Sequence, residues 1–153
     1  LMIHDIDLAL YLNGPIDKIA AFGSKENGSV AFASAIFQHA NGSVSRLIAS
    51  RMTEKKMRSI QVTAADAYID ADLLRRDVLV HQQSSILSHT DEAYVVSAST
   101  QQVEVKPREG LLEELKAFIA RCNGDDSVGT PGLDEGVEAQ RICKIVLESI
   151  KNV

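Results

Sequence analysis

The residues best suited to chemistry lie near the beginning of the chain, in the segment His4-Asp5-Ile6-Asp7. A histidine titrates near neutral pH, so His4 could take up and release a proton in an acid–base reaction. The structural alternative is that Asp5 and Asp7 favour the positive N-terminus of a helix while His4 caps it. A metal site is less favoured, because the three side chains are expected to project in different directions and no second histidine-rich motif completes a ligand set.

A second cluster is the basic run Arg51-Met-Thr-Glu-Lys-Lys-Met-Arg58, which stands in an otherwise acidic chain. Guanidinium and ammonium groups both suit phosphate, so this run could bind an anion. A solvated connection between two strands is the alternative. The run is too short to form a nucleic-acid surface.

The other candidate ligands are isolated from one another. His39, His81 and His89 have no metal-ligand spacing around them, and each is interpreted as a surface or turn residue. The sequence has no GxGxxG or GxxxxGKS motif, so the chain by itself gives no sign of a nucleotide site. We expect neither a metal-binding nor a cofactor-binding residue in it.

The elements that would position these residues follow from apolar periodicity and from four Asn-Gly pairs. The pairs at 13–14 and 123–124 end helical patterns, since glycine readily adopts the positive φ that closes a last turn. The pairs at 27–28 and 41–42 are typical of two-residue type I′ hairpin turns. The predicted strands cover residues 16–24, 29–38, 43–52, 58–66, 67–73, 76–82, 93–99 and 101–106. A loop is predicted at 84–92, and helices are predicted at the N-terminus, over 111–122 and over 137–150.

This order predicts an α+β fold, with a large, mainly antiparallel open sheet and helices packed on one face. The chain has 153 residues, 45% of them hydrophobic, and a formal net charge of −5. The acidic balance argues against nucleic acid and anionic membranes as partners. We expect a cytoplasmic protein with reduced thiols at Cys122 and Cys143. Leu1 already reads as helix interior, so further sequence is expected upstream of it.

The opening LMIHDIDLALYLNG resembles the start of the C-terminal domain in the Gfo/Idh/MocA family, whose members are NAD(P)-dependent oxidoreductases of sugars, inositols and sugar nucleotides. The family signature D-x-x-x-H-x-x-D-x-x-x-x-L-x-G is matched at the right spacing by His4, Asp7, Leu12 and Gly14. The segments ANGSVSRLIASR and KKMRSIQVTAADAYIDAD continue the resemblance. EGLLEELKAFIARCNG and GLDEGVEAQRICKIVLESI resemble the family's closing helix pair.

The resemblance implies roles for particular residues. His4 would correspond to the family's active-site histidine, which orients the reacting hydroxyl and helps to relay its proton as hydride moves to the nicotinamide. The segment before the strand at 58 usually lines the substrate pocket, which makes Arg51 and Lys55 candidate substrate-binding residues. Ala65 and Ala67 stand where many members have glycines, so the turn there is expected to differ.

The resemblance also implies a division of tasks between domains. Residues 1–153 would form the C-terminal substrate-binding and oligomerisation domain. An aspartate partner of His4 would lie four residues before it, just upstream of Leu1. The lysine of a Glu-Lys-Pro motif and the loop that binds NAD or NADP would belong to a preceding Rossmann domain absent from this chain, so the isolated chain should be inactive. The stretch RMTEKKMRSIQVTAADAYIDADLL looks most like members that act on the 3-hydroxyl of UDP-N-acetylglucosamine.

In the family the open sheet face packs against another subunit, and the strand at 29–38 is apolar on both faces. A homo-oligomer formed through that face is therefore expected. A second hypothesis, from a different class, is a non-catalytic binding or oligomerisation module without enzymatic activity of its own. The sequence upstream would discriminate the two, because only the enzyme requires GxGxxG and Glu-Lys-Pro motifs there.

Overall fold

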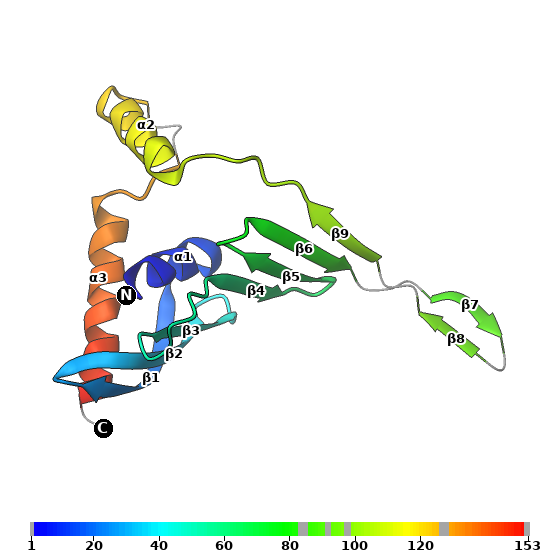
Figure 1. Ribbon diagram of the computed structural model, residues 1–153, viewed down its shortest axis with the longest axis horizontal. Helices are drawn as coiled ribbons and strands as arrows, with labels where there is room; N and C mark the ends of the chain where they lie inside the picture. The colour runs from blue at the N-terminus through cyan, green and yellow to red at the C-terminus, as the bar shows by residue number, and fades with distance from the viewer. Residues whose placement is uncertain (1, 83–85, 91–92, 97–98, 126–128, 152–153) are drawn as a thin grey trace. The chain divides into compact units, whose positions relative to one another are not determined.

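The computed structural model describes residues 2–82, 86–90, 93–96, 99–125 and 129–151 (Figure 1). The elements follow one another as α1 (Ile3–Asn13), β1 (Ile16–Glu26), β2 (Ser29–His39), β3 (Val44–Ser50), β4 (Ser59–Thr63), β5 (Ala67–Asp72), β6 (Asp77–Gln82), β7 (Ile86–Thr90), β8 (Ala93–Val96), β9 (Ser99–Val103), α2 (Gly110–Cys122) and α3 (Leu133–Lys151). Two compact units are formed, one from residues 1–54 and 117–153 and one from residues 55–116.

The predicted α+β class and antiparallel pairing are confirmed, with several open sheets in place of one large sheet. Within the described residues the strands belong to three sheets, with orders β1-β2-β3, β4-β5-β6-β9 and β7-β8, and each neighbouring pair is antiparallel. The prediction of a loop at 84–92 is wrong for residues 86–90, which form β7. β7 pairs with β8 through an irregular register between Ile86 and His89, and such a shift breaks the alternation by which a strand is recognised in sequence.

The core of the first unit lies between the β1-β2-β3 sheet and two helices. Alternate residues of β2, from Ala31 to His39, are buried on one face, as the period of two in a strand requires. α1 and α3 pack against each other, and α3 packs against β1 (Figure 1). Ile6 from α1, Ile142 from α3 and Phe37 from β2 are fully buried in the cluster that results. This packing fixes which side of α1 faces solvent.

The Asn-Gly pairs behave differently at the two hairpins. Asn27 and Gly28 have φ of 51° and 77°, which confirms the type I′ turn between β1 and β2. The same prediction at 41–42 is wrong, because only Gly42 has a positive φ, 85°. There the Asn41 side-chain oxygen accepts the Ser43 N–H at 2.9 Å, and this local bond holds asparagine out of the left-handed region.

The second unit is built around the four-stranded sheet. Its first hairpin is closed without glycine, by the Ala64 N–H donating to the Ala67 carbonyl at 2.8 Å. In the β5–β6 turn the Asp72 carboxylate accepts the N–H groups of Leu74 at 2.9 Å and Arg75 at 3.0 Å. These bonds hold the pKa of Asp72 below its ordinary value, chiefly through the Arg75 N–H. Arg76 completes the turn with a φ of 58°.

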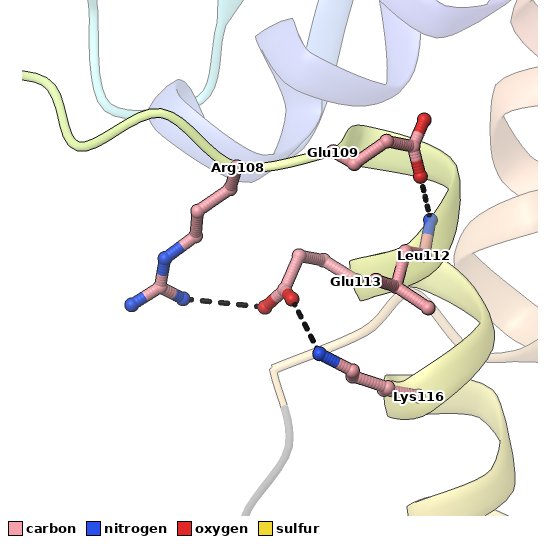
Figure 2. A network of polar contacts seen from close by, with 5 residues as sticks. All are labelled: Arg108, Glu109, Leu112, Glu113 and Lys116. Atoms are coloured by element: carbon pink, nitrogen blue, oxygen red, sulfur yellow. Dashed lines mark hydrogen bonds and ion pairs between the residues drawn. The ribbon is translucent and has the colours of Figure 1, made fainter.

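α2 begins at a network of exposed charges (Figure 2). Glu109 precedes the helix and its carboxylate accepts the Leu112 N–H at 2.5 Å, which satisfies one of the free donors of the first turn. Glu113 contacts Arg108 at 3.3 Å and Lys116 at 3.0 Å, and the hydrogen bond from Lys116 is the main cause of its lowered pKa. The predicted apolar stripe of α2 is present, but none of its residues is buried.

α3 begins after Gly132, whose N–H donates to the Glu135 side chain at 2.8 Å. This bond is half of a capping box, and α3 then buries Ala139, Ile142, Val146 and Ile150 along one side.

Cys122 and Cys143 are free thiols. Across the described residues, α3 and the other two helices are too short or too polar to cross a membrane.

Candidate functional site

His4 is the second residue of α1, and its side chain is exposed. The residue before the helix is Met2, which is buried and forms no side-chain cap. The interpretation of His4 as a cap is therefore wrong, because its backbone lies within the helix. Asp5 does lie in the first turn, where a negative charge is favoured by the helix dipole.

His4, Asp7 and Tyr11 follow one another at intervals of three and four residues, which places them along one side of α1. Asp5 projects in a different direction from His4, as expected. The same expectation is wrong for His4 and Asp7, which share one side of the helix. In the part of the chain that the structure describes, the His4 side chain forms no hydrogen bond or ion pair, so both of its ring nitrogens are available to a ligand. No group of His, Cys, Asp and Glu among those residues is arranged to hold a metal ion.

Arg51 and Lys55 are both exposed, but they belong to different units. Arg51 follows β3, and its N–H donates to the Ala31 carbonyl at 2.8 Å, so its backbone is anchored to β2. Neither side chain forms an ion pair with another described residue. Each cation is free to meet an anion, while the structure does not itself bring Arg51 and Lys55 into one site.

An open groove of about 540 Å³ lies beside α1 and α3. It is lined by Ile3 of α1 and by Val137, Cys143 and Leu147 of α3, among others. His4 does not line this groove. The neighbouring helical positions therefore differ in surroundings: Ile3 borders an apolar hollow, while His4 points into solvent.

The interpretation of His39 as a surface or turn residue is wrong, because its side chain is only 1% exposed. Its Nδ1 lies 2.8 Å from the Gly14 carbonyl oxygen, which can only accept, so this nitrogen carries the proton. Its Nε2 lies 2.8 Å from Ser45 Oγ, which also receives a hydrogen bond from Asn13 at 2.9 Å. These bonds attach the end of α1 to β2 and β3.

The burial of His39 had a signal in the sequence that was missed. Ala31, Ala33, Ala35, Phe37 and His39 occupy every second position of one strand, so all five face the same side. Because the first four are apolar and buried, the last is expected to be buried too.

His81 is likewise not isolated. Its ring centroid lies 5.9 Å from that of Tyr68, with an angle of 36° between the rings, and its Nδ1 lies 3.1 Å from Thr100 Oγ1. These residues occupy opposite positions on β5, β6 and β9. No local motif joins them in the sequence, since they meet only through strand pairing.

Comparison with known proteins finds a family model and several dehydrogenases that are similar to this chain. A family model described as the GFO/IDH/MocA C-terminal domain matches residues 1–70. The UDP-N-acetylglucosamine 3-dehydrogenase of Acidithiobacillus ferrooxidans is 26% identical over 155 residues, covering 97% of this chain and 45% of that protein. The chain thus spans less than half the length of this curated relative.

Solved structures show the same fold. A structure of the Acidithiobacillus ferrooxidans enzyme superposes with a TM-score of 0.82 at 23% identity, covering 99% of this chain and 46% of that one. Levoglucosan dehydrogenase in complex with NADH and levoglucosan gives 0.72 at 17% identity, with 99% and 47% covered. The WlbA dehydrogenase from Bordetella pertussis, in complex with NADH and UDP-GlcNAcA, gives 0.63 at 13%, with 99% and 41% covered. The resemblance expected from the sequence is confirmed: residues 1–70 match the GFO/IDH/MocA C-terminal domain, and the whole chain has the fold of these dehydrogenase structures.

Proposed function

We propose that this chain is the substrate-binding and oligomerisation domain of an NAD(P)-dependent oxidoreductase, which transfers hydride between a hydroxyl group of a sugar or sugar nucleotide and a nicotinamide. The observation that supports this most is His4, which lies within the segment that matches the family and presents an exposed, unpartnered imidazole. The relatives named above supply the reaction class: one is a UDP-N-acetylglucosamine 3-dehydrogenase, and others are complexed with NADH.

The chain by itself does not fit a dinucleotide. All strand pairs among its described residues are antiparallel, whereas the phosphate-binding turn of a Rossmann fold joins a strand of a parallel sheet to a helix. We therefore assign the cofactor to a separate nucleotide-binding domain. The contribution of this chain is to hold the substrate and to move a proton.

In this proposal His4 is the acid–base residue. A ring nitrogen accepts the hydrogen of the reacting hydroxyl, which orients the C–H bond from which hydride departs, and takes the proton as the carbonyl forms. Asp7 lies one turn along the same side of α1, so its carboxylate is presented beside the imidazole. The roles reverse when the carbonyl is reduced.

Arg51 and Lys55 are proposed to bind the anionic part of a sugar-nucleotide substrate. Both are exposed cations without an ion-pair partner in the described part of the chain. A guanidinium forms bidentate contacts with phosphate, and an ammonium acts as a point charge. Of the substrates named for the relatives, UDP-N-acetylglucosamine provides the diphosphate that these groups would recognise.

The outer face of the β1-β2-β3 sheet is proposed to pair with the same face of a second copy. The face opposite α1 and α3 carries Phe22, Ile36, Val44 and Ile48, which are 62%, 43%, 64% and 52% exposed. Arg46 lies opposite Ile36 on the same face, so apolar side chains surround a cation there. Interfaces between copies commonly mix apolar and polar residues in this way, and a two-fold axis lets two copies cover the same face.

A domain exchange tests the proposed function. The C-terminal half of the Acidithiobacillus ferrooxidans dehydrogenase is replaced by residues 1–153, and nicotinamide reduction is followed with UDP-N-acetylglucosamine. We expect turnover from the exchanged enzyme and none from the isolated chain. If the exchanged enzyme folds and binds the nucleotide sugar but shows no turnover, the chain is a binding module. Turnover by the isolated chain would refute the assignment of the cofactor to another domain.

A further inference from the structure

One face of the four-stranded sheet carries a continuous row of side chains across all of its strands. The register pairs Thr63 with Tyr68, Tyr68 with His81, and His81 with Thr100. Residues directly opposite each other share a face, so these four residues, the aromatic row, lie side by side. The adjacent row on that face consists of Gln61, Asp70, Leu79 and Gln102.

The aromatic row is held in place and accessible. The rings of Tyr68 and His81 are 5.9 Å apart and tilted by 36°, and Thr100 contacts His81 at 3.1 Å from the other side. Tyr68 is 37% exposed. An aromatic face that is braced by neighbours and open to solvent can stack against the weakly positive C–H face of a ligand.

The adjacent row supplies hydrogen-bonding groups at a suitable distance. Residues two apart on a strand are separated by about 7 Å, so a ligand on Tyr68 also reaches the level of Asp70 and Gln61. Neither Asp70 nor Gln61 forms a side-chain hydrogen bond with another described residue. A hollow of about 350 Å³ lies next to Gln102 at the edge of the sheet, with Arg76, Asp77 and Glu104 in its lining. No residue of the aromatic row lines this hollow.

The charges of this face decide what kind of ligand it suits. Asp70, Asp72 and Asp77 lie on it together, since they occupy alternate or opposite positions of β5 and β6. Such a surface repels phosphate and nucleic acid. An aromatic ring beside carboxylate and amide acceptors suits a neutral molecule with one C–H face and several hydroxyl groups.

We propose that the aromatic row and Asp70 form a binding surface for a neutral sugar ring, which stacks on Tyr68 and donates hydroxyl hydrogen bonds to Asp70. The proposal rests on the proposed function only for the choice of a sugar as the polyhydroxyl ligand. It requires no hydride transfer and no nucleotide.

The test is an NMR titration of the 153-residue chain with N-acetylglucosamine, and separately with UMP. The ring signals of Tyr68 and the imidazole signals of His81 should shift saturably with the sugar and should not respond to UMP. Tyr68→Ala should weaken binding by about tenfold or more, whereas Tyr68→Phe should retain it, because the ring provides the stacking face. Asp70→Asn should weaken binding while leaving the ring pair intact.

Gln101→Ala is the matched control, since Gln101 pairs with Val80 and therefore lies on the opposite face of the sheet. Its affinity for the sugar should equal that of the unchanged chain. The proposal is overturned if the two rings do not respond to the sugar, if UMP shifts them equally, or if Tyr68→Ala and Asp70→Asn bind as tightly as Gln101→Ala. A His4→Ala variant should bind normally at this surface, so failure of the domain exchange and failure of this binding are separate results.

Discussion

Two histidines of the first unit differ in what surrounds them. His39 is buried, and both of its ring nitrogens are engaged, by the Gly14 carbonyl and the Ser45 hydroxyl. His4 is exposed and has no partner among the described residues. A buried imidazole whose two nitrogens are hydrogen-bonded stabilises the fold, whereas an exposed imidazole can bind a ligand and exchange a proton.

Arg76 carries backbone strain that a single change should relieve. Its φ of 58° is unfavourable for a residue with a Cβ, by about 1–2 kcal/mol, whereas glycine adopts it freely. Arg76→Gly should therefore raise the free energy of unfolding by about 0.5–1 kcal/mol, after the extra chain entropy of glycine is subtracted. Urea denaturation measures this, with Leu74→Gly in the same turn as the control that should lower stability. A loss of stability in Arg76→Gly would show that its side chain matters more than its backbone.

Asp72 should make the second unit sensitive to acid. The Arg75 N–H, with help from the Leu74 N–H and the Arg75 charge, lowers the pKa of Asp72 from 3.8, so the folded chain favours the ionised form. This stabilisation is fully present when the pH is above the pKa of Asp72 in the unfolded chain. It is lost as the pH falls through the lower pKa of Asp72 in the folded chain. Asp72→Asn keeps a side-chain oxygen for the turn but removes the charge. In urea denaturation at several pH values, Asp72→Asn should therefore lose less stability in acid than the unchanged chain. Asp66→Asn is the control and should lose as much as the unchanged chain. Asp66 is exposed and forms no side-chain hydrogen bond in the described structure.

At the scale of elements, the sequence predicted what local patterns determine. Strand-like runs identified β1 to β6, with clear alternation at β4, and Asn-Gly correctly marked the ends of α1 and α2 and the turn between β1 and β2. It failed at β7, whose irregular register with β8 breaks the alternation, and at His39, whose position in the buried alternate row of β2 was not used. The Tyr68–His81 contact was missed because strand register creates it.

Gly23 tests how closely β1 packs against its neighbours. A Cβ at this position would collide with the Phe32 carbonyl oxygen and lie 3.0 Å from Ile150 Cδ1 of α3. Gly23→Ala should lower the free energy of unfolding by about 1–3 kcal/mol, as overpacked core positions do. Gly136→Ala is the control: it lies in α3 with open space around the added methyl, and should raise stability by about 0.5–1 kcal/mol. Thermal denaturation in which both changes act in the same direction would contradict this packing.

At the scale of the whole molecule, the fold class and the resemblance to the Gfo/Idh/MocA C-terminal domain followed from the sequence, and both are confirmed. His4, Arg51 and Lys55 remain predictions, because the structure gives their positions and exposure but not a substrate. The motif containing His4 is local and was therefore visible in sequence. How Arg51 and Lys55 meet a ligand depends on non-local placement, which spacing along the chain does not encode.

The apolar outer face predicts self-association. Ile36→Lys places a second cation opposite Arg46 on that face and should convert a dimer to a monomer, because two buried like charges without a counter-ion are costly. Leu133→Lys is the control, since Leu133 is 83% exposed at the start of α3 and should leave the dimer intact. Light scattering at micromolar concentration measures both. A monomeric unchanged chain would exclude the proposed interface.

The role of His4 as the proton carrier in hydride transfer is tested most directly by the turnover of the exchanged enzyme with and without His4→Ala. Loss of a general acid–base residue lowers kcat by about 10²–10⁴. We expect a fall of that size, with the folded structure retained because the His4 side chain is exposed and unpartnered in the described structure. An unchanged kcat in a folded His4→Ala enzyme would contradict it.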